Sequence, residues 1–337
     1  MTEISTLGEF ALIRHLTENI KIHNSSTVRG IGDDAAVLDY GEKETLVTTD
    51  LLLEGIHFDL TYVPLKHLGY KSAVVNFSDI YAMNGQPKQL TVSIGVSKRF
   101  SVEDLEDFYE GLRLACEVYG VDIAGGDTSA SMTGLCISIT CIGESEKGKT
   151  VYRNTANNTD LICVSGDLGA AYMGLQLLER EKAVFDGDKD FRPDFGGKEY
   201  LLERQLKPEA RRDIIKILND ENILPTSMID ISDGLSSELL HICKESAVGC
   251  RIYEDRLPID YQTAMMAEQF NMSLTTAALN GGEDYELLFT VPLALHGKAE
   301  DLDSIKIIGF ICESQAGASL IARDGTEAPL VAQGWNR

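Results

Sequence analysis

The first half of this 337-residue sequence alternates between segments typical of strands and segments typical of helices. The β-branched stretch TLVTTD predicts a strand, and the apolar and small-residue stretch at 66–84 that follows it predicts a helix. QLTVSIGV at 89–96 predicts another strand, and Ser101 with Asp104 forms a capping-box pattern for an amphipathic helix that ends at Gly120. VDIAGGD and LCISITCIG predict two further strands. This alternation restricts the chain to the α/β class.

The length and one turn-rich segment predict two domains. A single hydrophobic core rarely grows beyond roughly 250–300 residues, so a chain of this length is expected to divide. A turn rich in Gly, Lys and Glu at 143–150 closes the first block, and a new series begins with a strand at 160–166 and a helix at 168–179. We therefore predict one domain at 1–148 and a second α/β domain at 149–337.

The second half contains one irregular segment among its predicted elements. Residues 183–199 lack periodicity and are dense in Asp and Gly, which predicts a surface loop or lid. The predicted helices lie at about 208–219 and 234–245, and the predicted strands near 250–254, 285–291 and 305–311.

The charge balance argues against two classes of partner. With 30 basic and 53 acidic residues the formal net charge is −23, which disfavours non-specific binding to nucleic acid or to an anionic membrane. No run approaches the roughly 18 apolar residues of a membrane span, and the N-terminus lacks the apolar core of a signal peptide. Seven cysteines without a C-x-x-C pair fit reduced thiols. We expect a cytoplasmic protein in which metal ions accompany any phosphate ligand.

One segment, from Gly143 to Thr150, matches the P-loop pattern G-x-x-x-x-G-K-[ST]. A phosphate cradle offers backbone N–H groups and a helix N-terminus, whereas this segment places Glu144 and Glu146 where anionic oxygens would lie. The residues that follow, VYRNT, do not begin a helix. We therefore interpret the segment as a charged hairpin turn between strands.

Aspartates recur at strand ends or beside glycines, next to apolar residues. They are Asp33, Asp34, Asp50, Asp79, Asp127, Asp230 and Asp233. On the predicted helix, the spacing places Asp79 on one face with Ser72, Asn76 and Met83. Asp79 is therefore embedded in an otherwise apolar element. A carboxylate in such surroundings is costly unless it is paired, hydrogen-bonded or bound to a metal.

Taken singly, each of these aspartates also fits a helix cap or a turn. Taken together, they form a set of hard oxygen ligands without a His/Cys zinc spacing, and such a set suits Mg²⁺. Mg²⁺ typically binds a few carboxylates together with the phosphates of a substrate. The set therefore predicts nucleotide chemistry without a Walker A loop.

Six segments of the chain form a recognisable series. They are GIGDDAAVL, TTDLLLEGIHF, GYKSAVVNFSDIYAMNGQPK, AGGDTS, DISDGLSSEL and GGEDYELLFT. In this order and spacing they resemble the thiamine-monophosphate kinase family, which belongs to the aminoimidazole-ribonucleotide-synthetase-like superfamily of ATP-using enzymes. The resemblance runs from about residue 8 to residue 335.

The resemblance carries expectations about fold and activity. It implies a two-domain α/β fold with an N-terminal mixed sheet, and a homodimer in which the N-terminal sheets associate. It implies ATP as co-substrate and several Mg²⁺ ions. It also implies transfer of the γ-phosphoryl group of ATP directly onto the phosphate of thiamine monophosphate to give thiamine diphosphate, with no protein nucleophile.

The resemblance also assigns roles to residues, one position at a time. It implies metal ligands at Asp34, Thr48, Thr49, Asp50, Asp79, Asp127, Asp230 and Asp233. It implies ATP contacts at Tyr109, Gly126, Asp127, Arg153 and Ser232, with Tyr109 placed by its distance from the NFSD segment. It implies substrate contacts at His57, Glu283 and Trp335, the last an aromatic residue that packs on the thiamine.

The residue types alone support these assignments unevenly. His57 equally fits a surface or core histidine, and Trp335, the only tryptophan, fits a packing role. Glu283 and Asp284 are adjacent carboxylates that suit a cationic partner, although they also fit a turn before a strand. Arg153 suits a phosphate but also fits a solvated turn.

Two further segments have open interpretations. SGDLGAA at 165–171 fits either a second phosphate site or an ordinary helix start. The alanine-rich segment of the family is here IYAMNG, with Tyr81 and Asn84 in place of small residues, and these substitutions touch no proposed ligand.

Two other functions stay open at this stage. Another ATP-using superfamily member, such as a ligase acting on a formamide-containing ribonucleotide or a selenophosphate synthetase, would share the aspartates. The synthetase needs a reactive Cys in a glycine-rich N-terminal segment, and no Cys precedes Cys116. A nucleotide-sensing or scaffold protein would keep the fold but lose metal aspartates, and all the expected ones are present.

Overall fold

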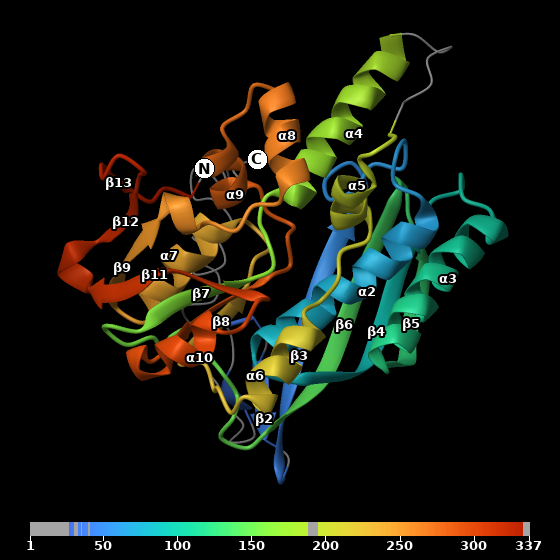
Figure 1. Ribbon diagram of the computed structural model, residues 1–337. Coiled ribbons are helices and arrows are strands. Elements are labelled where there is room, and N and C mark those ends of the chain that lie inside the picture. The colour runs from blue at the N-terminus through green and yellow to red at the C-terminus, as the bar shows by residue number, and fades with distance from the viewer. Residues whose placement is uncertain (1–26, 30–32, 35, 40, 188–194, 333–337) are drawn as a thin grey trace, which may run out of the picture.

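In the computed structural model, the described residues are 27–29, 33–34, 36–39, 41–187 and 195–332. They form two β-sheets with helices packed against them (Figure 1). The first sheet has the strand order β1-β2-β3-β6-β4-β5. Its strands are β1 (Thr27–Arg29), β2 (Ala36–Asp39), β3 (Lys43–Leu53), β4 (Gln86–Val96), β5 (Asp122–Ala130) and β6 (Leu135–Glu146). Since β4 and β5 pair in parallel and the other neighbours antiparallel, this sheet is mixed, as expected.

The second sheet has the order β13-β12-β9-β11-β7-β10-β8. Its strands are β7 (Leu161–Ser165), β8 (Ser227–Asp230), β9 (Val248–Tyr253), β10 (Leu287–Val291), β11 (Ile305–Glu313), β12 (Ala318–Ile321) and β13 (Glu327–Pro329). Here β12 and β9 pair in parallel, and the other neighbours are antiparallel.

The helices pack on both sheets. They are α2 (Leu65–Ala82), α3 (Val102–Tyr119), α4 (Ala170–Gly187), α5 (Glu199–Leu206), α6 (Arg212–Asp220), α7 (Leu235–Glu245), α8 (Tyr261–Gln269), α9 (Leu274–Asn280) and α10 (His296–Glu300). Among the described residues, no helix combines the length and apolar character that crossing a membrane requires.

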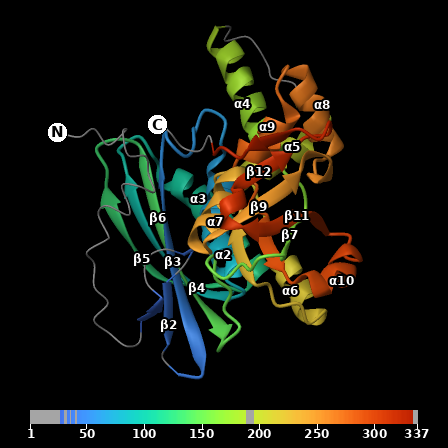
Figure 2. The same cartoon turned by 90° about the vertical axis from the view of Figure 1, so that its left-hand side faces the viewer.

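Helix α2 lies between the two sheets (Figure 2). Its residues from Leu68 to Ser78 are all buried, as expected for a helix that is apolar or small on almost every side. One hydrophobic cluster joins Leu46 and Phe77 of the first half to Phe289 of β10. The core is therefore continuous from the first sheet, through α2, to the second sheet.

Two glycines let α2 and α3 cross closely. A Cβ at Gly69 of α2 would lie 1.9 Å from the carbonyl oxygen of Phe108, and one at Gly111 of α3 would lie 1.7 Å from that of Lys66. Neither position accepts a side chain unless the helices move apart. This close crossing fixes α2, the helix that carries Asp79, against α3.

Several first-half predictions are confirmed. The predicted helix at 66–84 corresponds to α2, and the predicted strand at 89–96 lies within β4. Ser101 and Asp104 form the capping box: the Ser101 hydroxyl accepts the Asp104 N–H at 3.2 Å, and the Asp104 carboxylate accepts the Ser101 N–H at 2.7 Å. Gly120 ends α3 in the left-handed conformation, with a φ of 72°.

The predicted surface loop at 183–199 is wrong at its N-terminal end, whereas residues 195–198 contain no helix or strand, as predicted. Helix α4 continues to Gly187, and α5 begins at Glu199. The interval 188–194 lies outside the described residues. The sequence pattern also does not predict β8, α5, α8 or α9. The domain boundary near residue 148 falls between β6 and β7, and the division into two domains there stays a prediction.

Tyr81 and Asn84, the two departures from the family sequence, have local structural roles. Tyr81 is buried beside Tyr119, with the ring centroids 6.2 Å apart. Asn84 follows α2 with a φ of 57°, and its side-chain amide donates to the carbonyl oxygen of Lys149 at 2.9 Å. Asparagine adopts this left-handed conformation more readily than most residues, so it suits the end of the helix.

Candidate active site

Three carboxylates from distant parts of the sequence meet beside α2. Asp34 precedes β2, Asp79 lies on α2 and Asp230 ends β8, and one oxygen atom of each lies within 4.8 Å of the others. Asp50 of β3 lies near enough for its charge to raise the pKa of Asp79. The fold therefore gathers four of the predicted metal-binding residues in one place.

Hydroxyl groups hold two of these carboxylates. The Thr48 hydroxyl donates to Asp79 Oδ2 at 2.5 Å, and the Ser78 hydroxyl donates to Asp230 Oδ2 at 2.6 Å. Thr48 is buried on the same strand as Asp50. Such hydrogen bonds fix the carboxylate orientations without adding positive charge.

Burial and mutual repulsion disfavour the charged forms of the cluster. Burial raises the pKa of Asp34 well above its ordinary value although the Arg153 guanidinium opposes the shift, and Asp230 adds to it. Burial likewise raises the pKa of Asp79. It also raises the pKa of Asp50 to about 7, with the charge of Asp230 adding to the shift. Such a group of carboxylates is favourable in its ionised form only with a compensating positive charge.

The donor set fits a hard divalent cation. Oδ2 of Asp34 and Oδ2 of Asp50 are buried and have no hydrogen-bond partner among the described residues. Buried polar atoms without partners are uncommon and call for an explanation. Carboxylate oxygens in this number suit Mg²⁺. Bound cations would satisfy such unpartnered oxygens and offset the repulsion between the carboxylates.

Arg153 lies at the edge of this cluster and is largely buried, with 12% of its side chain exposed. Its Nε donates to Asp33 Oδ1 at 3.1 Å, and its Nη2 donates to Asp34 Oδ1. The Asp33 side chain is fully buried and also lies 3.5 Å from the Arg29 guanidinium. The interpretation of Arg153 as a solvated turn residue is therefore wrong. Asp33, to which the family resemblance assigned no role, fixes the position of Arg153.

Two other predicted metal-binding residues lie on the opposite face of the first sheet. Successive side chains of a strand point to opposite faces, so Thr49 points away from Thr48 and Asp50. Thr49 is exposed, and its hydroxyl donates a hydrogen bond to the carbonyl oxygen of Ile139 in β6 at 3.1 Å. Asp127 of β5 shares that face through the strand register. The roles of Thr49 and Asp127 as metal ligands stay predictions.

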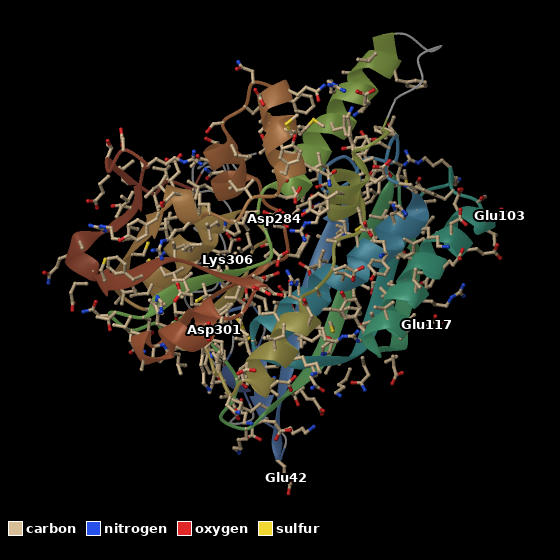
Figure 3. The ribbon with its side chains drawn as sticks, in the orientation of Figure 1. Glu42, Glu103, Glu117, Asp284, Asp301 and Lys306 are labelled. Atoms are coloured by element: carbon tan, nitrogen blue, oxygen red, sulfur yellow. The ribbon has the colours of Figure 1, made fainter. Side chains whose placement is uncertain are left out.

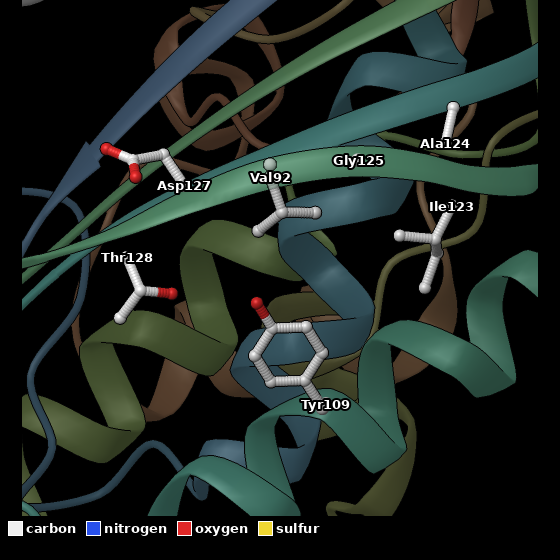
Figure 4. A pocket seen from close by; sticks show the side chains of 8 residues that line it. Val92, Tyr109, Ile123, Ala124, Gly125, Asp127 and Thr128 are labelled. Carbon is white, nitrogen blue, oxygen red and sulfur yellow. The ribbon is translucent and has the colours of Figure 1, made fainter.

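Three predicted ATP contacts line one pocket of about 480 Å³ between α3 and β5 (Figure 4). Tyr109 rises from α3 toward β5, where Gly126 and Asp127 lie. A Cβ at Gly126 would lie 2.0 Å from the carbonyl oxygen of Val92, so this position requires glycine. Ser232 and Arg153 do not line this pocket, so the predicted ATP contacts form two groups.

Ser232 and Asp233 lie in a tight turn between β8 and α7. Gly234 in this turn has a φ of 119°, and a Cβ there would lie 2.9 Å from the backbone at the end of α9. Gly282 has a φ of 71°, and its Cβ would lie 2.8 Å from the carbonyl oxygen of Ser232. The Glu283 N–H donates to that same oxygen at 2.6 Å. The two glycines thus let the DISDG and GGED segments pack backbone against backbone.

Glu238, in the first turn of α7, supports the Ser232–Asp233 turn and was not predicted. Its side chain is buried, and its carboxylate accepts the Asp233 N–H at 2.8 Å. Burial raises the pKa of Glu238 well above its ordinary value, and the charge of Asp233 adds to the shift. An acidic residue in the first turn of a helix was the available sequence signal, but it equally fits a favourable helix-dipole contact.

The Glu283 carboxylate is held by two residues that the sequence analysis missed. Lys71 Nζ of α2 lies 3.0 Å from Glu283 Oε1, and Gln205 Nε2 donates to Glu283 Oε2 at 2.7 Å. A charged residue within an apolar helix was a signal for Lys71, because a buried ammonium group requires partners.

Asp284 does not form the predicted pair of carboxylates with Glu283. It is 1% exposed and lies in the interior, whereas Glu103 and Glu117 project from the outer side of α3 (Figure 3). Its Oδ2 accepts the Gly169 N–H at 2.8 Å, just before α4. A carboxylate already lies at this helix N-terminus, so the SGDLGAA segment is an ordinary helix start and not a second phosphate site.

The other two predicted substrate contacts are His57 and Trp335. His57 is exposed in the loop after β3, and its Nδ1 accepts the Leu53 N–H at 3.0 Å. Trp335 lies outside the described residues. The convergence of His57, Glu283 and Trp335 on one substrate therefore stays a prediction.

The P-loop-like segment is not a phosphate cradle, as predicted. Gly143 and Glu144 lie in β6, which pairs with β3, and Glu144 forms ion pairs with Lys43 and Lys88 at 2.6 and 3.4 Å. The turn is not part of a hairpin, however, because the next strand, β7, begins only at Leu161. The intervening residues, 147–160, form a connection without helix or strand between the two sheets.

Replacing Lys149 by alanine should therefore leave nucleotide binding unchanged. Lys149 is exposed in the turn after β6, and no helix N-terminus follows it. Isothermal titration calorimetry with an ATP analogue should give the same dissociation constant for Lys149→Ala as for the unmodified protein. A loss of about a hundredfold, equivalent to about 2.7 kcal/mol, would restore the P-loop interpretation.

Comparisons with known proteins agree with this architecture. The family described as "AIR synthase related protein, N-terminal domain" matches residues 32–145. The thiamine-monophosphate kinase of Aquifex aeolicus (strain VF5) is 36% identical over 289 residues, covering 86% of this chain and 87% of the relative. That of Bacillus subtilis (strain 168) is 33% identical over 338 aligned residues, covering 98% and 99%.

The chain belongs to the thiamine-monophosphate kinase family.

Its fold confirms this family membership. A solved structure described as "AaThiL complexed with AMPPCP and TMP" matches with a TM-score of 0.84 and 32% sequence identity. The match covers 99% of this chain and 98% of that chain. The aminoimidazole-ribonucleotide-synthetase-like α/β fold that the sequence resemblance implied is therefore confirmed.

Proposed function

We propose that this chain is an ATP-dependent kinase that phosphorylates thiamine monophosphate to thiamine diphosphate with the help of Mg²⁺. The observation that carries the proposal is the cluster of Asp34, Asp79 and Asp230, whose oxygens lie within 4.8 Å of one another. The relative whose structure is described with AMPPCP and TMP supports the identity of both substrates.

The residues of this chain suit direct transfer between two phosphates. Mg²⁺ held by Asp34, Asp50, Asp79 and Asp230 would neutralise charge on the transferred phosphoryl group. Arg153, fixed at the edge of the cluster, is placed to donate hydrogen bonds to a phosphate oxygen. In-line attack by the acceptor phosphate needs the two substrates held end to end, so it requires positioning and no protein nucleophile.

The open face of the first sheet supports the proposed homodimer. Leu51 is 52% exposed on this face, and all residues of β5 are exposed. Association across this face would bring Thr49 and Asp127 next to a second subunit, which suits their separation from Asp79. We propose that residues 1–148 provide this interface and most metal and ATP contacts, and that 149–337 provide the rest.

A cytoplasmic location is part of the same proposal. All seven cysteines are free in the structure, and five of them are buried. Free thiols in this number fit a reducing compartment.

A comparison of acceptors tests the proposed function. Thiamine monophosphate, free thiamine and an unrelated phosphate monoester would each be incubated with ATP and Mg²⁺. The expected result is ADP and thiamine diphosphate from thiamine monophosphate, with no activity after EDTA treatment. A preference for free thiamine, or equal phosphorylation of the unrelated monoester, would refute the proposed acceptor even if ATP were consumed.

A further inference from the structure

Lys71 is a buried lysine on α2 that reaches into the second half of the chain. Its side chain is 7% exposed, and its Nζ lies 3.0 Å from Glu283 Oε1. The same nitrogen donates to the carbonyl oxygen of Gln205 at 3.0 Å. An ammonium group so removed from water is tolerated only when nearby acceptors compensate for the lost hydration. The position of Lys71 is therefore tied to that of the Glu283 carboxylate.

Glu283 is fixed at its backbone as well as at both carboxylate oxygens. Its Oε2 accepts the Gln205 Nε2–H at 2.7 Å, and its backbone N–H donates to the carbonyl oxygen of Ser232 at 2.6 Å. Its φ of 58° is left-handed, which is uncommon for a residue with a side chain. The side chain nevertheless stays 32% exposed, so the carboxylate keeps an accessible side with acceptor capacity left.

The ion pair changes what Glu283 can recognise. The positive charge of Lys71 compensates the negative charge of Glu283, so the pair attracts a cationic ring weakly. The oriented carboxylate can still accept a hydrogen bond from an N–H group in a defined direction. The exocyclic amino group of an aminopyrimidine is a donor of this kind, and thiamine monophosphate carries one.

Helix α2 also sets the distance from this pair to the aspartate cluster. Lys71 and Asp79 are eight residues apart, which corresponds to roughly 12 Å along the helix axis. Between them, the Ser78 hydroxyl donates to Asp230 at 2.6 Å and fixes the helix against β8. An elongated acceptor could therefore place its phosphate at the cluster and its amino group near Glu283.

We propose that Lys71 is a positioning residue for the acceptor: it fixes the Glu283 carboxylate so that this group accepts a hydrogen bond from the amino group of thiamine monophosphate. The inference rests on the proposed function and deepens it, because it identifies what determines the recognition of the end of the substrate remote from the reacting phosphate.

A double-mutant cycle tests this role by steady-state kinetics. Lys71→Met should raise the KM for thiamine monophosphate about tenfold, leave kcat within about threefold and leave the KM for ATP unchanged, because the lost contact is remote from the reacting atoms. In the Glu283→Gln background, the same substitution should change the KM less than about twofold, since Lys71 acts through Glu283.

The helix itself offers a matched control. Lys66, also on α2, pairs with Glu110 of α3 at 2.6 Å, and both side chains are about half exposed. Lys66→Met should leave both KM values unchanged. Gln205→Leu removes the other side-chain partner of Glu283 and should also raise the KM for thiamine monophosphate, so this variant provides the test if Lys71→Met does not fold.

The outcomes separate the two proposals. If the unmodified protein does not phosphorylate thiamine monophosphate, the proposed function fails and the role of Lys71 fails with it. If the unmodified protein is active, the role of Lys71 is refuted by an unchanged KM in Lys71→Met, or by independent effects of the Lys71 and Glu283 substitutions. A reduced kcat with an unchanged KM would also refute it, because that pattern indicates damage to the chemical step.

Discussion

The Asp79→Asn variant should catalyse phosphoryl transfer about a thousandfold or more slowly than the unmodified protein. In the absence of metal, however, the variant should melt at a higher temperature than the unmodified protein. Asp79 lies among other carboxylates, and both desolvation of its carboxylate and the charge of Asp50 raise its pKa. Asparagine keeps the shape of the side chain and can still accept the Thr48 hydroxyl, but it removes a repelling charge. Carboxylates gathered to bind a metal repel one another and lower the stability of the metal-free protein. The substitution should therefore stabilise the metal-free fold.

Thermal melting with and without Mg²⁺ checks this prediction independently of activity. Mg²⁺ should raise the melting temperature of the unmodified protein, because an ion that binds only the folded state stabilises it. That rise should be much smaller in Asp79→Asn. Asp107→Asn, on an exposed position of α3, is the control and should behave like the unmodified protein. Full activity, or an unchanged metal-dependent shift, in Asp79→Asn would contradict the assignment of Asp79 as a metal ligand.

The interactions that could be predicted from the sequence join residues close together in the chain. The Ser101–Asp104 capping box is an example, because both partners lie within one helical turn. The unusual environment of Asp79 was also predictable, since this residue lies on a helix that is mostly apolar or small. The sequence thus indicated which residues carry unusual chemistry, although it did not identify their partners.

The partners could not be predicted because tertiary packing selects them. Lys71 and Glu283 are separated by more than half of the chain, and only the packing of α2 against the second sheet brings them together. Asp33 was visible as one of a pair of aspartates, but its contact with Arg153 depends on the same folding. A local pattern gives no information about such distant contacts.

The error at 183–199 has a similar cause. Asp and Gly residues predicted a loop there. Near the start of this segment, however, side chains of α4 bind residues of the loop that precedes α2. The Tyr62 hydroxyl donates to Glu179 Oε1 at 2.6 Å, and Lys182 lies 2.6 Å from Asp59. Tertiary contacts of this kind override weak local propensity, so the helix continues to Gly187.

A substitution at Glu286, outside the aspartate cluster, should cost much more stability than a substitution in an exposed ion pair. Its side chain is 1% exposed, and it lies between the guanidinium groups of Arg204, at 3.0 Å, and Arg211. The Ser165 hydroxyl also donates to it. Burial raises the pKa of Glu286 in spite of both arginines, which shows how strongly this interior disfavours an ion. The network is therefore tolerable only while its charges remain matched.

Glu286→Ala would leave both guanidinium groups, each 15% exposed, without this carboxylate. Removing one partner of a buried ion pair costs about 3–5 kcal/mol, whereas an exposed pair contributes about 0–1 kcal/mol. At the average unfolding entropy per residue, the larger loss corresponds to a melting temperature lower by about 4–7 °C for a chain of this size.

Asp220→Ala is the matched control, because it breaks the Lys216–Asp220 pair, whose side chains are 75% and 60% exposed. Calorimetric melting of both variants should show a large shift for Glu286→Ala and almost none for Asp220→Ala. Equal shifts would mean that water reaches the Glu286 network and screens its charges as it does at the surface.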